Sequence, residues 1–227
     1  MQQLPLDLPV RPSYAEEDFL ETPANAQALA LVRLWPAWPQ QSLLLIGPEG
    51  SGKSHLAAIW AARAGARIFS AEQLDLSQPP LLAREKALAL EDADRAPDEN
   101  AFFHLLNLFA ESGAPLLITA RKSPEEWGLR TPDLLSRLRR VAKAEIAPPD
   151  EIFMRAILVK LFHDRQIRID ESVVDYLALR LERSAAAAQQ AVAALDRAGL
   201  AEGRAVTRPL AARVLADWFA AENDADH

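Results

Sequence analysis

Short apolar runs alternate with segments of helical periodicity through the first two thirds of the chain. Leu56, Ile59 and Trp60 recur at helical spacing after the first run, and similar spacing precedes the fourth run. The runs that we expect to form strands are residues 42–46, 66–69, 86–90 and 115–119, with a weaker candidate at 144–147. Strands that alternate with helices predict an α/β domain with a mainly parallel sheet.

The pattern changes at Pro148-Pro149, beyond which every segment has helical periodicity. The predicted helices span residues 151–165, 171–181, 185–198 and 208–221, and a further helix at about 25–35 precedes the first strand. Prolines at positions 5, 9 and 12 are incompatible with a helix at the N-terminus. The expected organisation is an extended arm (1–12), an α/β domain (13–147), a small all-helical domain (150–221) and an acidic tail (222–227).

Residues 47–54, G-P-E-G-S-G-K-S, satisfy the P-loop pattern in full, after an apolar strand and before a helix. The glycines let backbone N–H groups point at phosphate oxygens, and the following helix adds the positive end of its dipole. We expect Lys53 to reach the terminal phosphates and Ser54 to hold Mg²⁺. The residues expected to bind a purine nucleotide are Gly47, Gly50, Ser51, Gly52, Lys53, Ser54 and His55.

The third predicted strand ends in two acids, Glu91 and Asp92. In P-loop ATPases a carboxylate at this point orders the magnesium ion, and its neighbour can polarise the attacking water. We therefore predict Glu91 as a second Mg²⁺ ligand beside Ser54, and Glu91 and Asp92 as catalytic acids. The alternative is a capped strand end followed by a solvated acidic turn that includes Asp94.

The N-terminal arm places leucines at alternate positions behind a glutamine, in Gln3-Leu4-Pro5-Leu6-Asp7-Leu8. An extended segment of this kind can dock its leucines in a pocket while the glutamine makes polar contacts. From the residues alone, a disordered chain end is the alternative.

The formal charge of −7 on 227 residues disfavours a protein that binds DNA by itself, because neutralising phosphates requires basic residues. Basic residues cluster locally, at Arg121-Lys122 and between Arg137 and Lys143, as they do on ordinary solvated faces. The chain has no cysteine, no apolar run near the roughly 20 residues of a membrane span, and no secretory pattern at its start. We expect a cytoplasmic protein that does not contact a membrane.

Four segments together resemble the AAA+ branch of the replication initiator DnaA. They are the P-loop with Lys53-Ser54-His55-Leu56, the strand end at 90–92, T-P-D-L-L-S-R-L at 131–138, and L-D-R-A at 195–198. Within that branch the chain is similar to the Hda family, the regulatory relatives that inactivate DnaA. The resemblance covers nearly the whole chain from Tyr14 onward.

The resemblance implies a regulator that holds an adenine nucleotide, ADP or ATP with ADP expected, together with Mg²⁺. In Hda-like proteins an N-terminal Q-L-x-L-x-L peptide binds the β sliding clamp, and Gln3, Leu4, Leu6 and Leu8 match it. Arg137 matches the arginine finger, which would act in trans as a catalytic residue on DnaA-bound ATP and so prevent re-initiation. AAA+ proteins assemble through the nucleotide interface, so a nucleotide-dependent homodimer is a further expectation.

Three positions depart from the family pattern. Glu91 stands where aspartate is usual, Ala186 stands where the lid helix usually carries an arginine, and Arg121 follows Thr119 where a small polar or acidic residue is common. The first two departures, at Glu91 and Ala186, imply weak intrinsic hydrolysis and a preference for ADP. The sequence after the lid offers no helix-turn-helix of the kind with which DnaA reads its DNA boxes, so no sequence-specific DNA binding is expected.

Two other classes of P-loop protein are alternatives. A helicase loader of the DnaC type shares the core but has no reason to carry the leucines of the arm. A small-molecule kinase needs a different substrate pocket and lid, and gives Arg137 nothing to act on.

Overall fold

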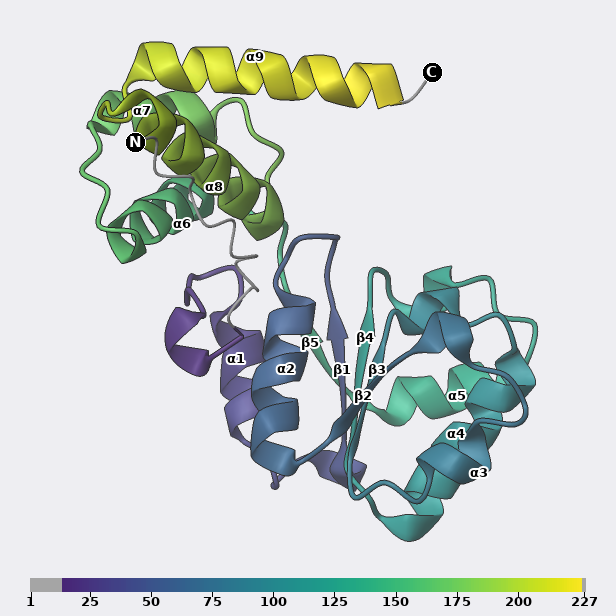
Figure 1. Ribbon diagram of the computed structural model, residues 1–227. Coiled ribbons are helices and arrows are strands. Elements are labelled where there is room, and N and C mark those ends of the chain that lie inside the picture. Colours follow the sequence, from purple (N-terminus) through teal and green to yellow (C-terminus); the bar gives the residue numbers. More distant parts are fainter. Residues whose placement is uncertain (1–13, 226–227) are drawn as a thin grey trace.

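The computed structural model describes residues 14–225 of the chain, with side chains up to Trp218. It contains a five-stranded parallel sheet with the order β2-β3-β4-β1-β5, followed by a separate group of helices (Figure 1). The strands are β1 (Ser42–Ile46), β2 (Arg67–Ser70), β3 (Leu88–Glu91), β4 (Leu116–Ala120) and β5 (Ala142–Glu145). The predicted alternation of strands and helices is confirmed, including the weaker fifth strand.

Helices cover both faces of this sheet. One face is covered by α1 (Ala26–Arg33) and α2 (Lys53–Ala64), and the other by α3 (Pro79–Leu82), α4 (Glu99–Ser112) and α5 (Pro132–Arg140). Leu43 and Leu45 of β1 pack toward the first pair, while Leu44 packs toward the second group. This alternation is the two-residue period of a strand, and a sheet buried on both faces explains why the strands are continuously apolar.

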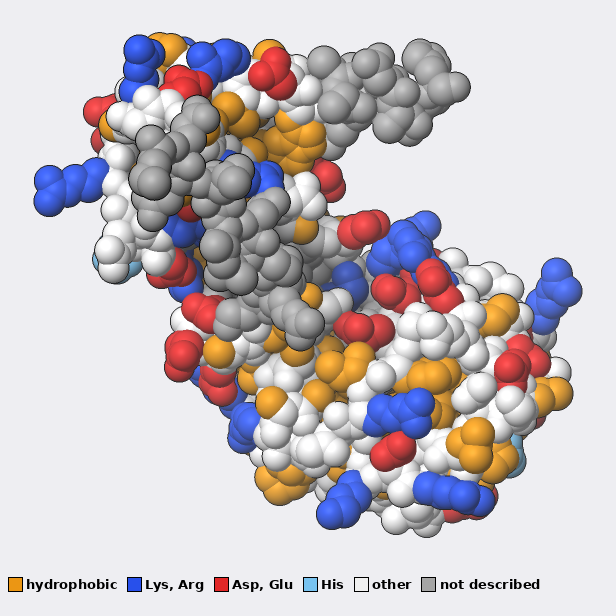
Figure 2. Space-filling model, viewed as in Figure 1, with side chains coloured by type: hydrophobic (Ala, Val, Ile, Leu, Met, Phe, Trp, Pro, Cys, Tyr) orange, Lys and Arg blue, Asp and Glu red, His pale blue; other side chains and the backbone are white. Residues whose placement is uncertain are grey.

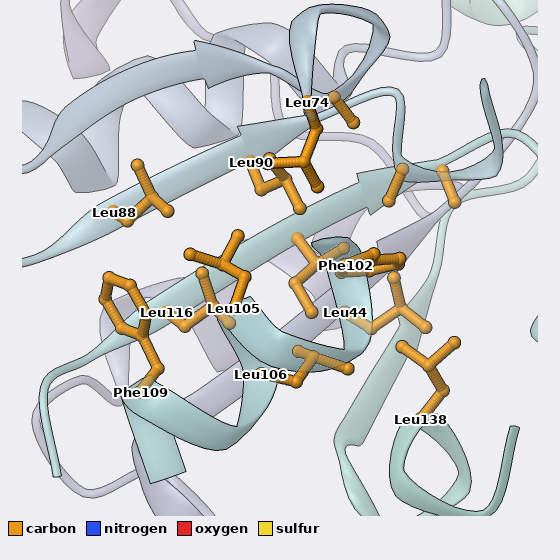
Figure 3. Packing of buried hydrophobic residues seen from close by; sticks show 14 of the residues in the cluster. Leu44, Leu74, Leu88, Leu90, Phe102, Leu105, Leu106, Phe109, Leu116 and Leu138 are labelled. Carbon is orange, nitrogen blue, oxygen red and sulfur yellow. The ribbon is translucent and has the colours of Figure 1, made fainter. Parts of the chain in front are cut away.

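The core between the sheet and α4 is built mainly from leucine and phenylalanine. Figure 3 shows side chains of α4 packed on those of β1, β3 and β4. The helix begins at Asp98, whose side chain accepts hydrogen bonds from the backbone N–H groups of Asn100 (2.9 Å) and Ala101 (3.1 Å). It ends at Gly113 in the left-handed conformation. The side chains that fill the core from α4 are Phe102, Leu105, Leu106 and Phe109.

The lid, by which we mean α6 (Glu151–Asp164), α7 (Glu171–Ala178), α8 (Ala185–Glu202) and α9 (Arg208–Ala225), has a core of its own. The buried alanines of α8 allow its neighbours to approach closely. Gly199 is a residue of α8 rather than its end, and the helix stops at Gly203, so α8 runs four residues beyond the predicted end. Conversely, α7 stops at Ala178, three residues before the predicted Leu181.

Residues 14–25 lead into the α/β domain and also contact the lid. Lys160 of α6 pairs with Asp18 at an Nζ–Oδ1 distance of 2.9 Å, and Leu20 packs against the core of the lid. Asn25 is buried and bonds within the same segment, to the carbonyl of Leu20 and the N–H of Thr22. The segment therefore ties the start of the α/β domain to the lid.

None of the helices within residues 14–225 has both the length and the hydrophobicity required to span a bilayer.

We expect Leu105→Ala to lower the free energy of unfolding of the α/β domain by about 2–5 kcal/mol, because it leaves a cavity at a fully buried position. Urea titration followed by tryptophan fluorescence measures this loss. His104→Ala, an exposed neighbour on the same helix, is the control and should change stability by less than about 0.5 kcal/mol. Equal midpoints for the two variants would contradict the packing described for α4.

Candidate functional site

The carboxyl ends of β1, β3 and β4 meet at one edge of the sheet, where the chemically active side chains gather. The backbone N–H of Gly47, just after β1, donates to the carbonyl of Ala120 at the end of β4 (3.1 Å). In the strand register, Ile46 lies beside Ala120 and Leu90 beside Ile118. The P-loop, the acids after β3 and the residues after β4 are therefore neighbours. This is the edge where open parallel sheets bind their ligands.

The P-loop glycines hold a backbone path that side chains would obstruct. Gly50 and Gly52 have φ angles of 72° and 96°, in the region that glycine adopts without steric cost. A Cβ on Gly47 would lie 2.7 Å from Oγ of Ser51 and 2.8 Å from the backbone oxygen of Ile146. The loop is thus a cradle of backbone N–H groups that leads into α2, which begins at Lys53.

Lys53 lies inside this cradle and is almost fully buried. Its Nζ donates to the carbonyls of Gly47 (2.7 Å) and Pro48 (2.8 Å). Burial lowers the pKa of the lysine, while Asp92, Asp94 and two further carboxylates nearby act against that shift. A lysine held within a glycine-rich loop at the start of a helix is suited to binding phosphate.

The acids after β3 have unusual geometry. Asp92 has φ 53° and ψ 47°, a left-handed conformation that few residues other than glycine adopt. Its backbone N–H donates to the hydroxyl oxygen of buried Thr119 on β4 (3.1 Å), which holds the strand end in place. Oε1 of Glu91 is buried and has no hydrogen-bond partner among the described residues, and the same is true of Oγ of Ser51.

These orphaned oxygens fit a bound magnesium nucleotide. Mg²⁺ is usually held by one or two carboxylates together with phosphates and water. Within the described part of the chain, no group of three or more His, Asp or Glu side chains is arranged so that it could hold a metal ion by itself. Glu91, with exposed Ser54 at the start of α2, could supply the few protein ligands that such an ion needs.

Arg121, just after β4, is the second cation at this edge. Its guanidinium lies 3.5 Å from Oδ2 of Asp94 and 3.7 Å from Oε2 of Glu49 in the P-loop, and its backbone N–H donates to Asp94. The arginine therefore links the P-loop to the turn after β3. Figure 2 shows basic and acidic side chains mixed on the rim of the larger lobe that faces the lid.

The start of α8 lies directly against the P-loop. A Cβ on Gly50 would come within 2.5 Å of Cβ of Ser184, the residue whose hydroxyl caps α8 by accepting from the N–H of Ala187. A cleft of about 200 Å³ lies beside this contact. Its lining consists of Glu49, Gly50, Leu181, Glu182, Ser184, Ala186, Ala187, Gln190 and Trp218. Ala186 thus faces the P-loop side of the lid with a methyl group, and the described lining includes two carboxylates but no arginine or lysine.

His55 is held by the segment that precedes α1. Its Nε2 lies 3.0 Å from the carbonyl oxygen of Ala15, and its ring packs edge-on against Tyr14 and Phe19. Phe19 also lies close to Gly52. The residues predicted to bind the nucleotide are therefore adjacent in the structure, with His55 turned toward the N-terminal segment.

Arg137 lies on α5, which covers the sheet face opposite to α2 (Figure 1). It is exposed, and its guanidinium lies 5.7 Å from the ring centre of Phe103 on α4. Among residues 14–225 the guanidinium makes no hydrogen bond or ion pair. The structure therefore does not bring Arg137 together with the P-loop of the same chain. The predicted arm residues Gln3, Leu4, Leu6 and Leu8 lie outside the described residues.

Sequence reasoning did not single out Ser184, Glu49 or Asp94 as parts of this site. Ser184 reads only as a helix cap in the sequence, and its contact with Gly50 joins segments from opposite ends of the chain. In the sequence, Thr119 and Arg121 stand out as a departure from a family pattern, and Arg121 also as part of a basic cluster, whereas the structure gives them partners, Asp92 and Asp94.

The lid matches a known family. Residues 153–215 match the family model described as the lid domain of Hda. Over the lid, this match confirms the resemblance to the Hda family that the sequence indicated.

Solved structures of AAA+ proteins have the same fold. With domain III of the replication initiation protein DnaA from Thermotoga maritima, the chain shares 20% identity at a TM-score of 0.76, covering 92% of this chain and 98% of that domain. With AMPPCP-bound DnaA from Aquifex aeolicus it shares 18% identity at a TM-score of 0.72, covering 83% of this chain and 67% of that chain. With the RuvB Holliday junction branch migration motor of Thermotoga maritima it shares 17% identity at a TM-score of 0.66, covering 84% of this chain and 66% of that chain.

The chain spans about two thirds of the length of the Aquifex DnaA and RuvB chains. At these identities the likeness shows the fold, and it confirms the predicted class, an AAA+ α/β domain with a mainly parallel sheet and a small helical lid.

We expect Gly47→Ala to weaken binding of ADP by about tenfold or more, because the added methyl would clash with Oγ of Ser51 and with the backbone oxygen of Ile146 and so distort the phosphate cradle. Titration with a fluorescent ADP analogue measures the dissociation constant. Gly113→Ala is the control, since it adds the same methyl at a left-handed position with open space around it. Unchanged affinity in Gly47→Ala would show that the cradle does not hold the phosphates.

Proposed function

We propose that this chain is a regulator of chromosome replication that acts on DnaA. It holds an adenine nucleotide, ADP in its working state, binds the sliding clamp through its N-terminal arm, and stimulates hydrolysis of DnaA-bound ATP. The Hda lid match and the DnaA-like fold support the partner. The nucleotide is supported by the P-loop geometry and by the AMPPCP that the Aquifex DnaA binds.

The observation that carries the proposal is the placement of Arg137. An exposed arginine without an acidic partner in the described structure, on the opposite side of the sheet from α2, is free to approach an anion on another protein. Arginine fingers supplied in trans stabilise the charge that develops on a transferring phosphoryl group. In the proposed complex the site of chemistry is the nucleotide of DnaA, and the P-loop of this chain is a regulatory site.

The lid is consistent with a slow intrinsic reaction. The residues that line the described cleft between α8 and the P-loop include Glu49 and Glu182 but no lysine or arginine, and the basic residue that pairs with Glu49, Arg121, belongs to the α/β domain. Negative charge beside the P-loop disfavours the more highly charged triphosphate. We therefore expect ADP to be retained in preference to ATP.

The first experiment is to measure hydrolysis of radiolabelled ATP bound to DnaA, with this protein and with DNA-loaded clamp, added separately and together. Acceleration that requires both additions is the expected result. A rate that neither addition changes, with ADP or ATP present, would contradict the proposal and favour a helicase loader of the DnaC type.

We expect Arg137→Ala to reduce the stimulated rate by about 10³-fold, the scale on which arginine fingers act. Clamp binding and ADP affinity should remain as in the unmodified protein. Arg140→Ala is the matched control, because Arg140 is exposed on the same helix and its substitution removes the same charge. Stimulation that survives in Arg137→Ala would exclude this residue as the finger.

Replacing both Leu6 and Leu8 by alanine should weaken clamp binding by about 100-fold or more, since each leucine buried in a pocket contributes about 1.5–3 kcal/mol. Surface plasmon resonance on immobilised clamp measures the affinity, and ADP binding should be unaltered. Leu200→Ala removes an exposed leucine of α8 and serves as the control. Equal clamp affinity in the double variant and the control would remove the arm from the proposal.

A further inference from the structure

The helix that carries Arg137 lacks a cap of its own. Thr131 precedes α5 in extended conformation, its side chain makes no capping hydrogen bond, and Pro132 occupies the first turn. The first N–H groups of a helix and of the turn before it need acceptors from elsewhere. For the two residues that precede α5, Arg130 and Thr131, the acceptor comes from another helix.

That acceptor is Glu99, the first residue of α4. Its carboxylate accepts hydrogen bonds from the backbone N–H of Arg130 at 3.0 and 3.1 Å and from the N–H of Thr131 at 2.8 Å. These bonds, first that from Arg130 and then those from Thr131, lower the pKa of Glu99 below its usual value. The carboxylate is therefore ionised at neutral pH and binds the backbone immediately before α5 as a charge-assisted clamp.

The same face of α4 also lies beneath the arginine. Phe103 is one helical turn after Glu99, and residues at this spacing are neighbours on a helix surface. The guanidinium of Arg137 lies 5.7 Å from the centre of the Phe103 ring, within the range of a cation–π contact. One face of α4 thus touches α5 at both its start and its exposed arginine.

The apolar contacts of α5 hold the helix against the sheet, and the hydrogen bonds to Glu99 add a directional constraint. Leu134 and Leu138 are fully buried and fix the helix against the sheet core. The hydrophobic stabilisation that these two leucines provide is non-directional. Hydrogen bonds to two successive N–H groups are directional, so they determine where α5 begins and hence where Arg137 is held.

We propose that Glu99 is a positioning residue for the arginine finger: by clamping the backbone of Arg130 and Thr131, it sets the position from which Arg137 reaches the nucleotide of DnaA. The inference rests on the proposed function of Arg137. Displacing a catalytic group by about 1 Å can slow a reaction by about 100-fold, so the loss of the clamp should affect rate more than affinity.

The clamp itself is tested on the protein alone, without DnaA. Hydrogen exchange followed by mass spectrometry or NMR should show at least about tenfold faster exchange of the Arg130 and Thr131 amides in Glu99→Ala. Glu99→Gln, which keeps an acceptor oxygen, should be intermediate. Glu111→Ala removes an exposed acid from the same helix and should leave these amides unchanged. Unaltered exchange in Glu99→Ala would overturn the inference whatever the outcome with DnaA.

The link to the finger is tested by the stimulated hydrolysis of DnaA-bound ATP. Glu99→Ala should lower the maximal rate at saturating protein by about tenfold, with little change in the half-saturating concentration, while Glu111→Ala matches the unmodified protein. In an Arg137→Ala background, Glu99→Ala should cause no further loss, because it acts through the arginine. Additive losses, or an unchanged maximal rate in Glu99→Ala, would overturn the inference.

Failure of the proposed function would give a different pattern. In that case the unmodified protein itself would not accelerate hydrolysis, while the exchange measurement would still decide whether Glu99 clamps α5.

Discussion

The P-loop is packed so closely from two sides that its glycines cannot be replaced without moving other parts of the protein. On one side the backbone after β5 leaves no room for a Cβ at Gly47, and on the other Ser184 of the lid occupies the space next to Gly50. The conformation of the phosphate cradle and the placement of α8 are therefore coupled by steric contact. Because packed contacts of this kind transmit displacement, a change in the P-loop on nucleotide exchange must be accommodated by the lid.

The charge around the cradle gives the site a limited chemistry. Lys53 and Arg121 lie there together with the carboxylates of Glu49, Asp92 and Asp94, and Arg95 also interacts electrostatically with Asp92 and Glu49. In the proposed function a divalent cation would offset these carboxylates beside a bound polyphosphate, and the unpartnered oxygen of Glu91 is suited to bind such an ion. The arrangement is that of a nucleotide-holding module, and it agrees with a reaction that takes place in the site of a partner.

In the proposed function, the helices on the two faces of the sheet have different roles: one face carries the nucleotide site and the other carries Arg137. The P-loop helix α2 belongs to one face, whereas α4 and α5 belong to the other and present Arg137 to solvent. A parallel sheet buried on both faces is a rigid support, so an arginine on one side can hold a fixed relation to a nucleotide on the other. Glu99 adds a directional bond to that support where apolar packing alone would not define the start of α5.

The sequence by itself determined the alternation of strands and helices, the change to an all-helical segment after Pro148-Pro149, and the position of the P-loop between β1 and α2, because these depend on local periodicity and on glycine. Its predicted ends of α7 and α8 were wrong: Leu181 lies beyond the end of α7, and Gly199 is a buried residue within α8 instead of marking its end. Only the tertiary structure decided that Ser184 touches Gly50, that Arg121 pairs with Asp94, and that Glu99 clamps α5. Each of these contacts joins residues far apart in the chain, and no local pattern specifies which distant backbone group a serine or a glutamate will meet.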